Sequence, residues 1–80
     1  EINRKVADPD KIFATIQEKY KDGKQDFLDG ISVDYDKWRF NLRKSNTEPV
    51  VRLNVETKGD AELLKAKTAE LLTIIGGQPG

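Results

Sequence analysis

Ten residues in the middle of the chain combine side chains that could bind a phosphate group. They run from Arg43 to Arg52 and read Arg-Lys-Ser-Asn-Thr-Glu-Pro-Val-Val-Arg. Hydroxyls, amides and backbone N–H groups donate hydrogen bonds to phosphate oxygens, and a planar guanidinium group can hold two such oxygens at once. The stretch supplies all of these donors within a few residues. We therefore interpret it as a phosphate-binding loop that the rest of the domain positions.

The donors of this loop have distinct expected roles. Ser45 and Thr47 supply hydroxyls, whereas Asn46 supplies an amide and tolerates the positive φ that turns successive N–H groups toward one point. Arg43 and Arg52 stand on the two flanking strands, so both lie close to the loop if those strands pair as a hairpin. The predicted phosphate ligands are Arg43, Ser45, Asn46, Thr47 and Arg52.

The other loop residues are predicted to support the site. Lys44 and Glu48 are placed in this role; a carboxylate does not bind phosphate, so Glu48 is better suited to hold an arginine or a neutral hydroxyl. Pro49 stiffens the exit of the loop. An ordinary polar turn is the alternative, because Ser, Asn, Thr and Pro also dominate loops that bind nothing. Residue types alone leave the two interpretations about equal.

The composition predicts a small domain without catalytic residues of its own. Its 80 residues, 36% hydrophobic and 35% charged, suit one soluble globular domain. Fourteen basic residues balance fourteen acidic ones, which argues against a nucleic-acid or membrane-surface binder. Without cysteine or histidine the chain lacks thiolate ligands and the commonest general base, so we expect no metal and no cofactor here. No membrane span or signal peptide is visible, and the expected location is the cytoplasm.

Hydrophobic periodicity predicts the elements that position the loop. One helix is predicted over 9–21, capped by Asp8 and ended by Gly23; a second begins at the cap Asp60 and stops at Gly76-Gly77. Alternating patterns predict strands on both sides of an Asp29-Gly30 two-residue turn within 25–35, and a weaker pattern predicts a first strand. That first strand is predicted over 2–7, and two later strands are predicted over 38–43 and 50–57.

This order predicts an α+β domain of the form β-α-β(4)-α. Tight turns imply a mainly antiparallel sheet, and two amphipathic helices imply that both lie on one face of it. The other face should be exposed, with Arg43 and Arg52 in its polar phase. Residues 1–76 are predicted to form the domain, and residues 77–80 a loose tail.

The chain resembles the C-terminal, fourth domain of the α-D-phosphohexomutases. The resemblance rests on the run from Arg43 to Arg52 and on its flanks: Asp29-Gly30, the strand at Trp38-Arg39-Phe40, and the residues 53–57. It covers essentially the whole chain and is most similar to bacterial phosphomannomutase/phosphoglucomutase. Relatives that act on glucosamine phosphate tend to have glycine in place of Asn46, and a phosphoglucosamine mutase domain is the nearest alternative.

The resemblance implies a role within a four-domain enzyme. There a phosphoserine in the first domain exchanges phosphate with the sugar, an aspartate-rich loop holds Mg²⁺, and the third domain reads the sugar. The fourth domain closes over the cleft and binds the phosphate that is not transferred. The implied partners are mannose or glucose 1- or 6-phosphate, the hexose 1,6-bisphosphate and the other three domains. The implied fold is TATA-binding-protein-like, and the isolated domain is expected to be inactive.

Two further classes of function compete with this interpretation. A nucleic-acid-binding module, which fold analogy alone suggests, needs a basic stripe and stacking aromatics on the exposed face of the sheet. Here the outward residues mix signs and the aromatic residues fall on the buried phase. A protein-binding module without a ligand is the other class, and in it the loop arginines would be dispensable to every activity.

Overall fold

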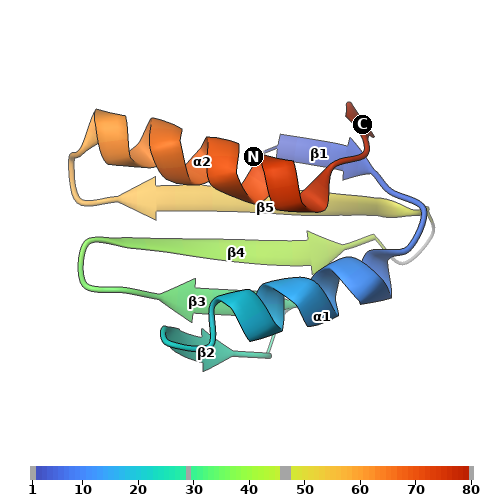
Figure 1. Cartoon of the computed structure of the whole chain (residues 1–80), viewed down its shortest axis with the longest axis horizontal. Helices are drawn as coiled ribbons and strands as arrows, with labels where there is room; N and C mark the ends of the chain where they lie inside the picture. Colours follow the sequence, from blue (N-terminus) through green and yellow to red (C-terminus); the bar gives the residue numbers. More distant parts are fainter. Residues whose placement is uncertain (1, 29, 46–47, 80) are drawn as a thin grey trace.

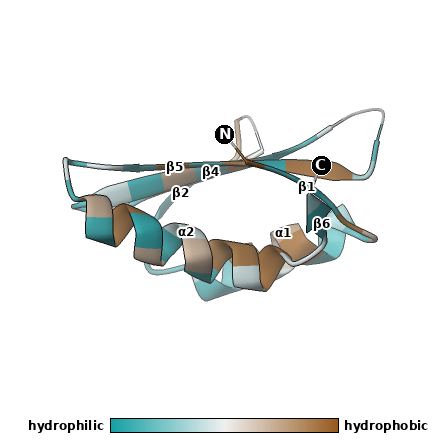
Figure 2. Cartoon of the chain, turned by 90° about the horizontal axis from the view of Figure 1, so that it is seen from above, coloured by the Kyte–Doolittle hydropathy of each residue, from teal (hydrophilic) through white to brown (hydrophobic). Residues whose placement is uncertain are grey.

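A six-stranded antiparallel sheet forms one layer of the domain, and two helices form the other (Figure 1). A computed structural model describes residues 2–28, 30–45 and 48–79. Both helices lie on the same face of the sheet, and the opposite face is bare (Figure 2). The predicted α+β class and the placement of the helices are therefore confirmed. The TATA-binding-protein-like topology stays a prediction.

The strands follow the order β2-β3-β4-β5-β1-β6 across the sheet. Strands β2 to β5 are consecutive in the chain and form a meander, and β1 then pairs with the far side of β5. The strands are β1 (Ile2–Lys5), β2 (Lys24–Asp26), β3 (Ile31–Asp34), β4 (Trp38–Lys44), β5 (Val50–Thr57) and β6 (Gln78–Pro79).

Alternation along each strand separates the core from the bare face. On β4, Trp38, Phe40 and Leu42 are buried, whereas Arg39 and Arg43 occupy the opposite phase. The helices α1 (Pro9–Lys19) and α2 (Ala61–Ile75) cover the apolar side. The buried core residues are Val6, Ile16, Tyr20, Ile31, Val33, Trp38, Phe40, Leu42, Val51, Leu53, Leu71 and Ile75.

Both helices begin at the predicted caps. The carboxylate of Asp8 accepts a hydrogen bond from the Lys11 N–H at 3.2 Å, and that of Asp60 accepts one from the Leu63 N–H at 2.9 Å. Helix α2 stops at Gly76, which has a φ of 63°. Neither helix in the described part of the chain is long and apolar enough to cross a lipid bilayer.

Helix α1 does not end in the predicted way. It stops at Lys19 with Tyr20 as its C-cap, and Gly23 is not one of the glycines with positive φ. Glycine is needed there for space, because a Cβ atom at this position would lie 2.5 Å from Cγ1 of Val33 and 2.8 Å from the ring of Tyr35.

Two connections also differ from the sequence-based expectations. The hairpin of β2 and β3 forms, but Asp26 pairs with Ser32, so the four residues 27–30 separate the strands and the two-residue turn was wrong. Of the predicted turn, Asp29 lies outside the described residues. After α2, where the sequence indicated a loose tail, Gln78 and Pro79 pair with β1.

A hydrogen bond between the helices closes an aromatic cluster in the core. The ring of Tyr20 lies edge-on to Phe40 at 5.0 Å and to Trp38 at 6.0 Å. Its hydroxyl donates to Oε1 of Glu70 at 2.6 Å, while Nζ of Lys67 lies 3.4 Å from Oε2 of the same carboxylate. The polar end of a core tyrosine thus joins α1 to α2.

This contact predicts a specific contribution to stability at acid pH. The hydrogen bond from Tyr20 lowers the pKa of the Glu70 carboxyl below its usual 4.5, with Lys67 adding to the effect and burial opposing it. A carboxyl whose pKa is lower in the folded state stabilises the fold above its unfolded pKa, and this stabilisation is lost as the pH falls through its folded pKa. We therefore expect the difference in melting temperature between wild type and Glu70→Gln to be constant above about pH 5.5 and to shrink below about pH 4.5. Thermal unfolding followed by circular dichroism measures this, and parallel profiles for the two proteins across that range would contradict it.

Candidate functional site

The predicted phosphate loop connects β4 and β5 at one end of the sheet (Figure 1). Backbone hydrogen bonds hold both of its ends. The Ser45 N–H donates to the carbonyl of Val50 at 2.9 Å, and the Val6 N–H donates to the carbonyl of Pro49 at 2.8 Å. The loop is thus tied both to its own hairpin and to the segment between β1 and α1. Asn46 and Thr47 lie outside the described residues, and their phosphate contacts stay predictions.

Arg43 and Arg52 are direct neighbours across the hairpin. They form a register pair of β4 and β5, and both belong to the bare face of the sheet. Directly opposed residues of an antiparallel pair hold their Cβ atoms about 4.5–5.5 Å apart, and like charges in this position destabilise the sheet. An anion bound by both guanidinium groups removes that repulsion. The structure therefore brings together the two arginines that the sequence analysis selected.

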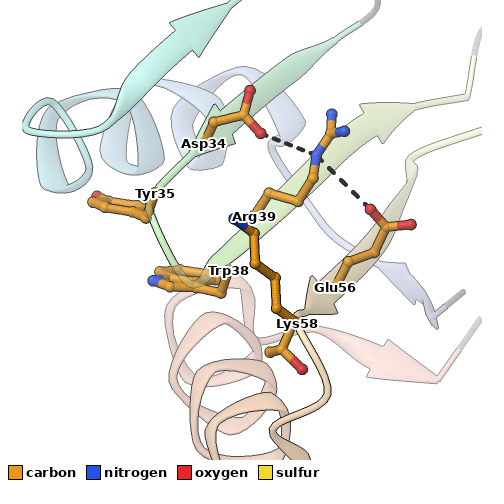
Figure 3. Close-up of a pocket in the computed structure, with 7 residues that line it drawn as sticks. Asp34, Tyr35, Trp38, Arg39, Glu56 and Lys58 are labelled. Carbon is orange, nitrogen blue, oxygen red and sulfur yellow. Dashed lines mark ion pairs between the residues drawn. The ribbon is translucent and has the colours of Figure 1, made fainter.

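The same face carries an arginine with a different environment. Arg39 lies on β4 with Asp34 of β3 and Glu56 of β5 as its register partners. Its Nε is 3.1 Å from Oδ1 of Asp34 and 3.8 Å from Oε2 of Glu56 (Figure 3). At this end of the sheet, the guanidinium group of Arg39 lies between two carboxylates. At the loop end, Arg43 and Arg52 are register partners.

The two residues with a predicted supporting role, Lys44 and Glu48, do not lie with Arg43 and Arg52 in the structure. Alternation puts Lys44 on the opposite phase of β4 from Arg43, and its Nζ lies 2.9 Å from Oδ1 of Asp10 in the first turn of α1. Lys44 therefore links the loop to the helix. Glu48 is exposed and forms no ion pair with another described residue, and its supporting role stays a prediction.

Asn3 lies in register with Arg52 and Arg43 across three neighbouring strands, and the sequence analysis did not identify it. It is the register partner of Arg52 on β1. Its Oδ1 is buried and accepts no hydrogen bond from any described residue. No local signal marks Asn3, because its position depends on the pairing of β1 with β5, whose residues lie about fifty positions later in the chain.

A hollow of about 370 Å³ lies at the other end of the sheet, away from the loop (Figure 3). Several side chains that line this hollow contact each other or a neighbouring residue. Tyr35 stacks on Trp38 with ring centroids 5.0 Å apart, and the Tyr35 hydroxyl donates to Asp22 at 2.7 Å. Burial and this bond raise the pKa of Tyr35, which keeps it protonated. The lining residues are Asp34, Tyr35, Trp38, Arg39, Glu56, Thr57 and Lys58.

The described residues offer no metal centre. Over 2–28, 30–45 and 48–79, no group of three histidine, cysteine, aspartate or glutamate side chains is arranged to hold a metal ion. Among the described residues at the loop end, Arg43 and Arg52 supply guanidinium groups and Ser45 supplies a hydroxyl, and such groups bind anions. The chemistry that this arrangement supports is the binding of an anion.

Comparisons with known proteins show the family to which the chain belongs. A family model described as "Phosphoglucomutase/phosphomannomutase, C-terminal domain" matches residues 1–73. A protein of Xanthomonas campestris named "Phosphohexose mutases" is 51% identical over 79 residues, covering 96% of this chain and 18% of the relative. A phosphomannomutase of Escherichia coli is 51% identical over 77 residues, covering 94% of this chain and 17% of the relative.

A further relative has a lower identity. A phosphomannomutase of Methanocaldococcus jannaschii is 45% identical over 75 residues, which cover 94% of this chain and 16% of that protein. The chain thus spans less than a fifth of the length of each of these relatives. The family model and the relatives agree on one assignment: the chain belongs to the phosphoglucomutase/phosphomannomutase family and corresponds to its C-terminal domain.

Proposed function

We propose that this chain binds the non-transferred phosphate of a hexose phosphate and closes the active-site cleft of a phosphohexomutase. The activity is that of a phosphomannomutase/phosphoglucomutase, with mannose or glucose 1- or 6-phosphate and the hexose 1,6-bisphosphate as ligands. One observation carries the proposal. Arg43 and Arg52 form a register pair of like-charged residues at the base of the predicted phosphate loop.

The geometry suggests how the site would work. Arg43 presents a planar fork to two phosphate oxygens, and Arg52 adds a second positive charge from the neighbouring strand. Ser45, Asn46 and Thr47 contribute hydrogen-bond donors from the loop. The two backbone anchors at Pro49 and Ser45 reduce the motion that binding must suppress, and such preorganisation strengthens binding.

A site of this kind binds the phosphate group and makes no specific contact with the sugar ring. This property suits a mutase, because the bisphosphate intermediate must be held in either of two orientations. The loop then neutralises the charge of one phosphate while the other reacts elsewhere. Phosphoryl transfer itself, with the phosphoserine and Mg²⁺, is assigned to the other three domains, so the isolated chain is expected to bind without turnover. The proposed location of the enzyme is the cytoplasm.

A phosphate titration of the ¹⁵N-labelled 80-residue chain tests the binding site directly. We expect inorganic phosphate and mannose 6-phosphate, at millimolar concentrations, to shift the amide signals of residues 43–48, because hydrogen bonds to phosphate form there. Sodium chloride at the same ionic strength controls for general screening. Arg43→Ala should abolish the shifts, and Arg39→Ala, on the same strand and face, should leave them intact. Shifts centred on the hollow around Arg39 would contradict the assignment.

A further inference from the structure

The connection between β2 and β3 presents two large apolar side chains to solvent. Phe27 is 56% exposed and Leu28 is 93% exposed. The other exposed large hydrophobic residue in the described part of the chain is Leu64 on α2, at 36%. Single exposed apolar residues are ordinary, whereas two large ones next to each other in the chain are candidates for a contact surface. We refer to Phe27 and Leu28 as the apolar tip.

The backbone of the apolar tip is held in a defined shape. The Leu28 N–H donates to Oδ1 of Asp26 at 2.8 Å. Gly30 follows with a φ of 72°, and a Cβ atom at this position would collide with the carbonyl oxygen of Leu42 and lie 3.0 Å from Cα of Arg43. The segment therefore packs against the strand that carries Arg43. Its apolar side chains are exposed although its backbone is anchored.

The apolar tip lies at the same end of the sheet as the phosphate loop. Ile31 at the start of β3 pairs with Leu42 near the end of β4, and the loop begins directly after that strand (Figure 1). Leucine carries no hydrogen-bonding group and cannot bind a phosphate or a sugar hydroxyl. A surface that contacts the apolar tip must therefore itself be apolar, and it must approach the domain from the ligand side.

We propose that the apolar tip docks on an apolar recess of the other domains of the same enzyme when the cleft closes over substrate. This inference rests on the proposed function. The other domains are the chosen partner because this chain accounts for only 16–18% of the length of its relatives. In the proposed function, those domains line the cleft that this domain closes. Contacts that exist only in the closed state shift the equilibrium toward closure and strengthen substrate binding.

The test uses Leu28→Ser in the full-length enzyme that carries this domain. Because Leu28 is 93% exposed, the substitution removes almost no packing within the domain and the melting temperature should be unchanged. We expect the KM for the hexose phosphate to rise about tenfold, the size expected when a leucine no longer becomes buried on closure. Small-angle X-ray scattering should show a smaller contraction on substrate binding. The double variant Phe27→Ser/Leu28→Ser should show larger effects of both kinds.

Two parallel variants separate the possible outcomes. Leu64→Ser makes the same chemical change on α2 and should alter neither KM nor contraction. If Leu28→Ser behaves like wild type while Arg43→Ala raises the KM, the proposed function stands and the docking inference is overturned. If Arg43→Ala has no effect, the phosphate-binding proposal itself fails. If Leu28→Ser instead converts a wild-type dimer to a monomer in sedimentation, the occupant is a second copy and the inference is likewise overturned.

Discussion

Replacing Arg43 by alanine in the full-length enzyme will lower kcat/KM for the hexose phosphate about a hundredfold. A hydrogen bond to a charged group contributes about 1.5–3 kcal/mol, and a guanidinium fork makes two of them to one phosphate. A hundredfold change corresponds to about 2.7 kcal/mol, slightly less than two such hydrogen bonds at the lower value. The fold should persist, because Arg43 lies on the bare face of β4 and outside the core. Steady-state kinetics together with thermal unfolding measure both quantities.

Arg39→Ala is the matched control for this experiment. Arg39 is an arginine on the same strand and the same face, and its guanidinium already pairs with Asp34 and Glu56. Its side chain is 51% exposed, and surface ion pairs of this kind contribute about 0–1 kcal/mol to folding. We expect a small loss of stability and unchanged kinetics. Equal kinetic losses for Arg39→Ala and Arg43→Ala would point to a general electrostatic effect and would refute a local site.

A substitution in the core should have the largest effect on stability. Phe40→Ala is expected to lower the free energy of unfolding by about 3–5 kcal/mol. Phe40 is 1% exposed on a central strand and contacts the rings of Tyr20 and Trp38, with centroids 5.0 and 5.5 Å away. At about 0.05–0.15 kcal/mol per residue, a chain of this length has roughly 4–12 kcal/mol in total. The variant should therefore be partly or wholly unfolded at 25 °C, as urea denaturation will show.

Phe27→Ala provides the comparison at an exposed site. It removes the same atoms from a side chain that is 56% exposed and outside the core, so a change of about 0.5 kcal/mol or less is expected. Phe40→Leu fills most of the space and should lose only about 1–1.5 kcal/mol. Similar losses for Phe27→Ala and Phe40→Ala would show that burial in the sheet does not govern the stability of this domain.

The local part of the fold was predictable from short sequence patterns. Alternation of apolar and polar residues identified β3, β4 and β5, because each buries one face only. Asp8 and Asp60 marked the helix starts, because capping depends on atoms within three residues. Gly23 was not predicted correctly from local patterns. Its residue type predicted a helix end, whereas its role depends on packing against Val33 and Tyr35, which lie in and after another element.

The candidate site likewise has features that are local in the sequence and could be predicted, and features that depend on contacts between separate segments. A hairpin loop brings its two flanking strands together, so Arg43 and Arg52 could be predicted as neighbours from the sequence. The ion pair of Lys44 with Asp10 spans 34 positions, and no local pattern indicates it. The exposed position of Leu28 was equally hidden, because the two-residue turn predicted at Asp29-Gly30 placed it in a strand. The four-residue connection between β2 and β3 places Leu28 outside both strands, where it is exposed.

The two edges of the sheet determine how this domain can meet other polypeptide. At one edge, Pro79 of β6 has no N–H group to offer a further strand. At the other edge β2 has three residues and carries the charged side chains of Lys24 and Asp26. Short, charged or proline-containing edges oppose strand addition and edge-to-edge aggregation. These edges therefore disfavour pairing of this sheet with that of a neighbour, which leaves the loops and faces as the surfaces for contact with other polypeptide.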